Sequence, residues 1–199
     1  PPMTDTEGND IPADPAGPTI LFVFKSSIEQ HVGEISYFRV VSGKVTEGME
    51  LLNMRTENKE KLSQLFAVAG KNRVKVSEMS AGDIGCTVKL KSTRTGDTLA
   101  PAGSHTVISP MVFPEPRYRA AVRAVNQADE EKLGELLNKA RYEDPTLLVE
   151  YSKELKQTIV QGQGELHLKI LRDQIMGGSK IDIEYFAPRI PYRETITKT

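Results

Sequence analysis

The sequence predicts two domains, an all-β barrel followed by an α+β domain. Residues 19–110 contain only short strand-like segments separated by glycine-rich or polar turns, whereas residues 111–186 combine strands with two segments of helical period. Three prolines, Pro110, Pro114 and Pro116, stand where the pattern changes. We therefore place the domain boundary at residue 110.

Residues 1–18 precede the first strand-like segment and show no apolar periodicity. The segment is rich in proline and carries Asp5, Glu7, Asp10 and Asp14 without a lysine or arginine. Such a composition is typical of a linker or a flexible surface loop.

Six strand-like segments follow one another at short, fairly even intervals in residues 19–110, as expected for a small barrel. They are ILFVFK (20–25), EISYFRVVSG (34–43), MELLNM (49–54), EKLSQLFAV (60–68), RVKV (73–76) and IGCTVKL (84–90). Cys86, in the last of these, is predicted to be a small buried side chain.

The second domain reads strand, helix, strand, strand, helix, strand, which is the βαββαβ order of a ferredoxin-like domain. The strands are expected at residues 117–125, 147–152, 157–161 and 180–186. Asp129 can cap the first helix, and Pro145 ends it.

Each helix has a predicted buried face. Leu133, Leu136, Leu137 and Ala140 share one side of the first helix. In the second helix, which starts at Gly164, the buried side holds Leu168, Leu171 and Ile175, with Leu166 and Ile170 beside them.

Composition and charge are ordinary for a soluble protein. Of the 199 residues, 38% are hydrophobic and 27% charged, with a net charge of −1. No apolar run or leader points to a membrane, and the single cysteine rules out an internal disulfide, so we expect a cytoplasmic protein. The near-neutral charge argues against nucleic-acid binding through bulk charge.

The turn Gly162-Gln163-Gly164, which precedes the second helix, is a candidate phosphate cradle. The P-loop pattern GxxxxGK[ST] is absent from the chain, and Leu166-His167 stand where GxGxxG would need its third glycine. The favoured interpretation is that the glycines permit a tight strand-to-helix turn.

His167 is a candidate general base and a candidate metal ligand. No motif supplies it with a nucleophile, and Glu165 is too close in sequence to share its helix face. His31 and His105 lie far away in sequence. We expect a surface or interface histidine, with neither a catalytic residue nor a metal site in this chain.

Basic residues of the barrel form a candidate phosphate-contacting patch. The candidates are Arg39, Lys59, Lys61, Lys71, Arg73 and Lys75. Because Lys71, Arg73 and Lys75 alternate along a strand, they share one face. An ordinary solvated strand face remains an equal alternative.

Arg117, Arg119 and Arg123 could form an RNA platform on the second domain's sheet. The third strand, however, lacks the aromatic residues that stack on bases. The first and last strands of a ferredoxin-like sheet are neighbours, so Asp182 and Glu184 are expected to pair with these arginines.

Taken together, these segments resemble the second and third domains of elongation factor G, a translational GTPase. The matching stretches, in the family's order, are VGEISYFRVVSG, SAGDIGCTVKL, TGDTL, MVFPEP, YEDPTLLVE, TIVQGQGELHLKI and APRIPYRETI. GELHL and FPEP favour elongation factor G and eukaryotic factor 2 over other translational GTPases. The family usually reads GMGELHL, so Gln163 in place of methionine is consistent with a divergent paralogue.

The resemblance implies a translation-factor barrel that contacts small-subunit rRNA and protein, and a ferredoxin-like domain that faces the GTPase switch regions and the fusidic acid pocket. The residues it places at that interdomain surface are Asp144, Pro145, Thr146, Gly164, Glu165, Leu166 and His167.

The resemblance also implies a GTPase domain, with GTP and Mg²⁺, outside this chain, since the chain has no P-loop and no NKxD. Residues 1–18 would arrive from that domain, and residues 187–199 would lead towards a fourth domain. The expected parent is a monomeric ribosomal translocation factor, in which these domains relay the nucleotide state without catalysis of their own. The alternatives are an enzyme with a catalytic GxGELH loop and a stand-alone RNA- or ribosome-binding module.

Overall fold

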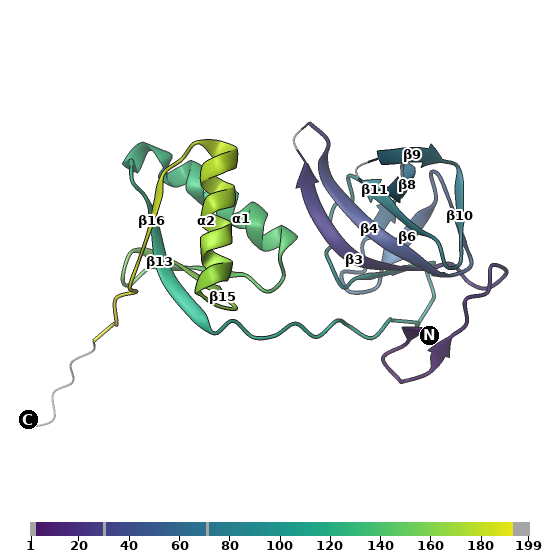
Figure 1. The fold of residues 1–199 in the computed structure, drawn as a ribbon. Coiled ribbons are helices and arrows are strands. Elements are labelled where there is room, and N and C mark those ends of the chain that lie inside the picture. The colour runs from purple at the N-terminus through teal and green to yellow at the C-terminus, as the bar shows by residue number, and fades with distance from the viewer. Residues whose placement is uncertain (1–2, 30, 71, 193–199) are drawn as a thin grey trace, which may run out of the picture. The chain divides into compact units, whose positions relative to one another are not determined.

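In the computed structural model, residues 3–29, 31–70 and 72–192 are described. The chain divides into two units, Pro1–Val112 and Phe113–Thr199 (Figure 1). Each unit has a hydrophobic core of its own and is treated separately below.

The first unit is built on one eight-stranded antiparallel sheet, in the order β7-β6-β12-β3-β4-β11-β8-β9. Its strands are β3 (Ile20–Glu29), β4 (Gly33–Ser42), β6 (Glu50–Asn53), β7 (Lys59–Lys61), β8 (Leu65–Ala69), β9 (Asn72–Val76), β11 (Ile84–Val88) and β12 (Thr98–Ala100). A separate antiparallel ribbon pairs β5 (Lys44–Thr46) with β10 (Glu78–Ser80).

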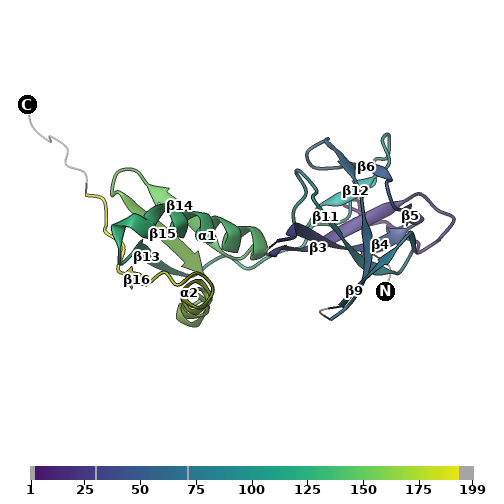
Figure 2. The ribbon, with the colours of Figure 1, turned by 90° about the horizontal axis from the view of Figure 1, so that it is seen from above.

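The sheet curls around one core. Buried side chains from strands near both ends of the order, such as Leu51 of β6 and Leu65 of β8, join the same cluster as Phe38 in the centre. Val45 and Met79 of the ribbon complete it. The strands therefore surround this core in a barrel-like arrangement (Figure 2), which confirms the predicted all-β class.

The strands differ from the prediction where they are short. Residues 60–68 contribute to two strands, β7 and β8, because residues 62–64 between them are not part of a strand. Leu62 is nevertheless fully buried, so the apolar pattern runs on through the break. The three-residue strands β5, β10 and β12 were missed, since three residues are too few to show a period.

The described part of residues 1–18 does not form the predicted flexible loop. Residues Met3–Thr4 (β1) and Asp10–Ile11 (β2) pair as a small hairpin, and Ile11 is buried against Phe22 and Ile108. Its backbone is also tied down, since Thr6 N–H donates to Val107 O at 2.9 Å. The composition was misleading because two apolar side chains, Met3 and Ile11, and backbone hydrogen bonds suffice to hold this segment.

The second unit has a four-stranded antiparallel sheet in the order β14-β15-β13-β16. Its strands are β13 (Tyr118–Ala124), β14 (Leu148–Ser152), β15 (Gln157–Gly162) and β16 (Ile183–Phe186). Its helices are α1 (Glu130–Glu143), after a 3-10 turn (Gln127–Asp129), and α2 (Glu165–Ser179). The order βαββαβ and the sheet order confirm the ferredoxin-like fold (Figure 1).

The helices pack on one face of this sheet. The shared core holds Ala120, Val122, Ala124, Leu133, Leu137, Val160, Leu168, Leu171 and Ile175. The predicted buried faces are therefore confirmed, but Leu166 is 69% exposed and Ile170 48% exposed. Both lie on α2 off the line that faces the sheet.

The start of the first helix also differs from the prediction. Asp129 accepts no capping hydrogen bond; instead, the Asn126 side chain accepts from Ala128 N–H at 3.2 Å and begins the 3-10 turn. The second helix runs beyond Ile175 to Ser179 and ends where Lys180 adopts a left-handed φ of 56°.

Candidate functional site

The end of α1 is fixed by Asp144. Its N–H donates to Ala140 O at 2.8 Å, and Pro145 cannot continue the helix. Its Oδ1 accepts two hydrogen bonds from Thr146, from the N–H at 2.8 Å and from the hydroxyl at 2.7 Å. The carboxylate is thereby held in one orientation, with Oδ2 directed at α2.

His167, in the first turn of α2, meets that carboxylate. Its Nε2 lies 2.9 Å from Asp144 Oδ2, while the backbone N–H of Gln163 donates to its Nδ1 at 3.1 Å. Because Nδ1 accepts, the proton sits on Nε2 and is donated to Asp144. Neither ring nitrogen is free to act as a general base in this arrangement. We call Asp144, Thr146, Gln163 and His167 the α1–α2 cluster.

The Asp144 carboxyl is ionised in this cluster. Burial raises its pKa, but the hydrogen bonds from Thr146 and the interaction with His167 outweigh burial and hold the pKa below its ordinary value. An ionised carboxylate is a hydrogen-bond acceptor only. The Asp144 carboxylate is therefore suited to joining α1 to α2 through a hydrogen bond, and not to donating a proton.

The two glycines of the turn play different parts from the predicted one. Neither adopts a left-handed φ, so the backbone conformation does not require glycine at either position. A Cβ on Gly162 would lie 2.9 Å from His167 Nδ1 and 3.0 Å from Leu168 Cδ2, so a side chain there would displace the imidazole. Gly164 is extended, with φ of −179°, and a Cβ there would meet nothing within 4 Å. Nothing in the described chain requires glycine at Gly164.

The turn also holds the segment that enters the second unit. Gln163 Nε2 donates to Pro114 O at 2.9 Å, and Arg117 N–H donates to Gly162 O at 2.9 Å. These contacts were not predicted, because no periodic or compositional signal links residues so far apart in the chain.

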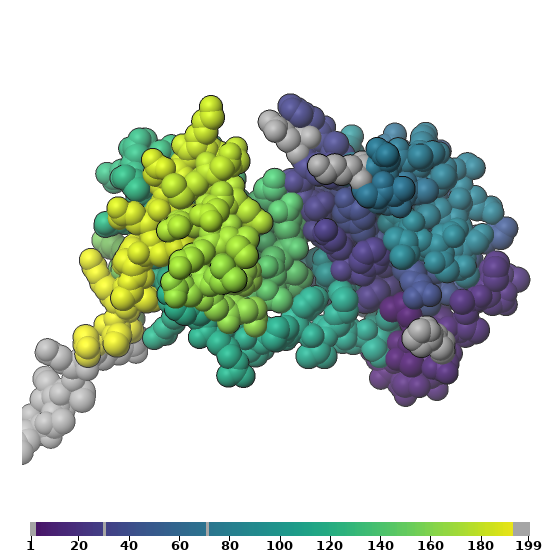
Figure 3. Space-filling model, viewed as in Figure 1, coloured from purple at the N-terminus to yellow at the C-terminus, as the bar shows by residue number. Residues whose placement is uncertain are grey.

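The surface beside the cluster is apolar at its centre. Leu166 and Ile170 are exposed on adjacent turns of α2, and Glu165 pairs with Lys169 at 3.0 Å along the same helix. In the space-filling view, the yellow-green atoms of α2 lie uncovered on the visible face of the second unit (Figure 3). The predicted residues Asp144–Thr146 and Gly164–His167 are thus brought together, with an exposed apolar strip next to them.

Three of the six candidate basic residues of the barrel form ion pairs. The Lys59 Nζ lies 3.2 Å from Glu50 Oε1, and the Lys75 Nζ lies 2.7 Å from Glu47 Oε1. Arg73 forms an ion pair with Glu29. Arg39 and Lys61 form no ion pair with the described residues, and Lys71 lies outside the residues that the structure describes.

The strands that carry these residues are also separated in the sheet. Lys59 and Lys61 lie on β7, and Arg73 and Lys75 lie on β9, at opposite ends of the strand order. These four residues are therefore not a row on neighbouring strands, and three of them, Lys59, Arg73 and Lys75, already have acidic partners.

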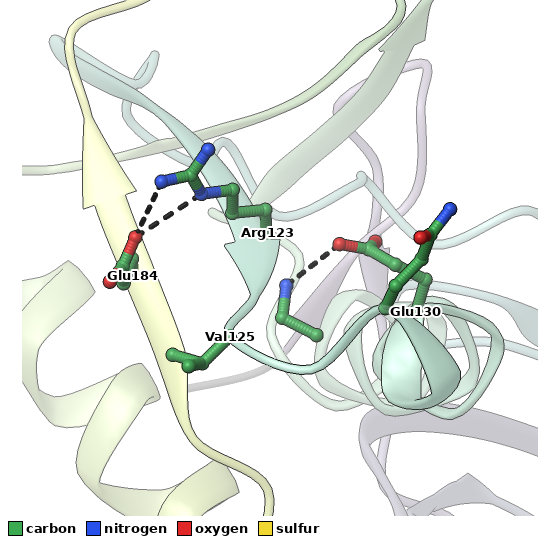
Figure 4. A pocket seen from close by; sticks show the side chains of 6 residues that line it. Arg123, Val125, Glu130 and Glu184 are labelled. Carbon is green, nitrogen blue, oxygen red and sulfur yellow. Dashed lines mark hydrogen bonds and ion pairs between the residues drawn. The ribbon is translucent and has the colours of Figure 1, made fainter.

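The sheet of the second unit shows the predicted charge pairing. Arg123 lies opposite Glu184 in the register and donates to its Oε2 from Nη2 at 2.8 Å and from Nε at 3.2 Å. Glu130 accepts from the Ala124 N–H at 2.9 Å. Figure 4 shows both interactions in one hollow, so its charged groups are already satisfied. Asp182 contributes its backbone oxygen, to Val125 N–H, in place of the expected side-chain pairing.

Other site chemistries find no support among the described residues. No group of three or more His, Cys, Asp or Glu side chains there could hold a metal ion. None of the helices in that part of the chain is both long and apolar enough to span a bilayer. Cys86 is fully buried, as predicted, and burial raises the pKa of its thiol, which disfavours the reactive thiolate.

Comparison with known proteins agrees with this domain order. The family described as elongation factor G domain 2 matches residues 18–102, and the family described as elongation factor G, domain III, matches residues 113–186. A crystal structure of a protein from Thermus thermophilus is similar over 92% of this chain, with a TM-score of 0.78 and 29% sequence identity. This chain spans 27% of that protein's length.

Proposed function

Because the chain belongs to the elongation factor G family, of which it carries domain 2 and domain III, we propose that its parent is a ribosomal translocation factor. The observation that carries this proposal is the match of both domains in the family's order. The parent would act as a cytoplasmic monomer and bind GTP with Mg²⁺ in a GTPase domain outside this chain. The small share of the similar Thermus protein that the chain spans supports a longer parent.

In this proposal the barrel contacts small-subunit rRNA. Arg39 and Lys61 are the best candidates, since neither forms an ion pair with the described residues and Lys61 is exposed on an edge strand. Lys59, Arg73 and Lys75 would have to exchange their acidic partners for phosphates, which weakens their expected contribution.

The α1–α2 cluster and the exposed side of α2 would face the GTPase domain. Three observations support this role: the direct bond between Asp144 and His167, the exposed apolar strip of Leu166 and Ile170, and the open space around Gly164. A glycine that its own domain does not require leaves room for a partner to approach the backbone closely.

The relay would work through the rigidity of this cluster. Asp144 closes α1 and His167 opens α2, so the bond between them ties both helices to one contact surface. A partner that presses on Leu166 would therefore shift both helices together. This provides a physical basis for coupling between the nucleotide state and the ribosome contact.

Sedimentation of the 199-residue chain with purified small ribosomal subunits tests the proposal. We expect co-sedimentation that weakens with salt and is displaced by intact elongation factor G. Lys61→Glu should lower the affinity several-fold and reduce the salt slope by about one, whereas Lys153→Glu in the second unit should not. Equal affinity for naked RNA would favour the stand-alone RNA-binding module, and no binding to either would overturn the ribosomal assignment.

A further inference from the structure

The segment that joins the two units is held to the second unit by two hydrogen bonds. Residues 113–117 lie against the turn between β15 and α2, where Pro114 O accepts from Gln163 Nε2 at 2.9 Å. Arg117 N–H donates to Gly162 O at 2.9 Å just before β13 begins. Pro114 and Pro116 restrict φ to about −65°, so fixing one carbonyl limits the direction of the whole segment.

Gln163 belongs to two networks at once. Its side chain bonds to Pro114, and its backbone N–H donates to His167 Nδ1 at 3.1 Å. The His167 ring is in turn bonded to Asp144 at the end of α1. A continuous path of hydrogen bonds therefore runs from Asp144 through His167 and Gln163 to Pro114.

We propose that Gln163 is a positioning residue that couples the α1–α2 cluster to the connecting segment, residues 113–117. While His167 is paired with Asp144, the Gln163 backbone is held and its side chain reaches Pro114. When that pairing is disturbed, the turn shifts and the connecting segment is released. The biological use of this coupling rests on the proposed function, but the coupling itself is a property of the chain alone.

The hydrogen bond to Pro114 depends on the type of side chain at residue 163. Of the two polar groups in the Gln163 side chain, only the NH₂ group can donate a hydrogen bond to the Pro114 carbonyl. Methionine has a similar length without a donor, and glutamate is acceptor-only when ionised. Both substitutions therefore remove the bond to Pro114 and keep the backbone N–H that faces His167.

Amide hydrogen exchange and ¹⁵N relaxation of the full 199-residue chain test the first step. In Gln163→Met and Gln163→Glu, the Arg117 amide should exchange about twofold to tenfold faster, as expected for the loss of one hydrogen bond. The backbone amides of Phe113, Glu115 and Arg117, the residues of this segment that carry an N–H, should gain fast motion. Gln161→Met is the matched control two residues earlier, near the end of β15. Gln161 makes no side-chain hydrogen bond with the described residues, so this variant should change neither measurement.

A double-mutant cycle tests the coupling itself. His167→Ala should also speed exchange at Arg117, by at least about twofold, and this effect should disappear in the Gln163→Met background. Asp144→Ala, which leaves the imidazole in place, should behave in the same way and serves if His167→Ala folds poorly. Unchanged exchange in both variants, or effects that simply add to that of Gln163→Met, would overturn the proposal.

These experiments use neither ribosomes nor a GTPase domain. A failure of the ribosomal assignment would appear as lost co-sedimentation with the exchange results intact. A failure of the coupling would appear as independent effects at Gln163 and His167, whatever the chain binds.

Discussion

The imidazole of His167 is held from both sides, by a backbone N–H and by a carboxylate. Such a half-buried ring contributes to stability through both hydrogen bonds and through the space that it fills. Gly162 belongs to the same arrangement, because only a residue without Cβ lets the backbone approach Nδ1. Contacts within the second unit therefore explain the residue types at Gly162 and His167, but they do not explain the glycine at Gly164.

Substitution of the two glycines should separate their roles. Gly162→Ala is expected to destabilise the second unit by about 1 to 3 kcal/mol, because the new methyl group meets the His167 ring. Gly164→Ser should change stability by no more than about 0.5 kcal/mol, since serine is a good helix N-cap and the position is open. Urea unfolding measures both. Equal losses of stability would contradict the assigned roles.

The buried Asp97 carboxylate should give the barrel a pH-dependent stability. Although burial raises its pKa, hydrogen bonds from Arg55, Arg94 N–H and Asn53 outweigh burial and lower it. A lowered folded pKa means that the contribution is present above the unfolded value of about 3.9 and is lost as pH falls through the folded pKa.

Asp97→Asn removes this charge and should cost about 1 to 3 kcal/mol at pH 7. The cost is smaller than for a fully buried pair because the Arg55 side chain remains 41% exposed. Urea unfolding of both proteins at pH 7 and pH 3 should show the difference shrinking in acid. A difference that does not depend on pH would mean that packing, and not charge, accounts for the loss.

At the scale of elements, α2 has one side that packs in the core and one side that is exposed. Leu168, Leu171 and Ile175 close the core, whereas Leu166 and Ile170 lie on the exposed strip. A helix that needs only its buried side for stability can leave the other side for binding. Stability and binding should therefore respond to different leucines of one helix.

Leu168→Ala should cost about 2 to 5 kcal/mol in urea unfolding, because it leaves a cavity between α2 and the sheet. Leu166→Ala should stay within about 0.5 kcal/mol of the unchanged protein. In a binding assay with the separate GTPase domain of an elongation factor G, Leu166→Asp should weaken association, and Asp173→Leu should not. Binding that survives Leu166→Asp would remove this strip from the proposed contact.

At the scale of the whole molecule, two units with separate cores are joined by an extended, proline-rich segment. Val112, at the end of the first unit, is 94% exposed. Domain boundaries of this kind are preferred sites of proteolysis. The chain should therefore be cut at residues 110–113 before either core opens.

Limited digestion with elastase and mass spectrometry tests this. We expect two resistant fragments that correspond to the barrel and the ferredoxin-like unit, each with a cooperative unfolding transition of its own. Gln163→Met should speed this cut, because the connecting segment is then released from the turn. First cuts within β3 or α2 would contradict the separation into two units.

The class of both units, the order βαββαβ and the buried faces of α1 and α2 could be predicted from the residues alone. These follow from local periodicity, and the pairing of Arg123 with Glu184 follows from the sheet order that the topology implies. The three-dimensional fold was needed to establish the short strands β5, β10 and β12, the packing of residues 3–18 on the barrel, and the separate roles of Gly162 and Gly164. It alone joined Asp144 to His167 across 23 residues and Gln163 to Pro114 across 49. Periodicity records which side of an element is buried, whereas contacts between distant polar groups depend on how finished elements meet.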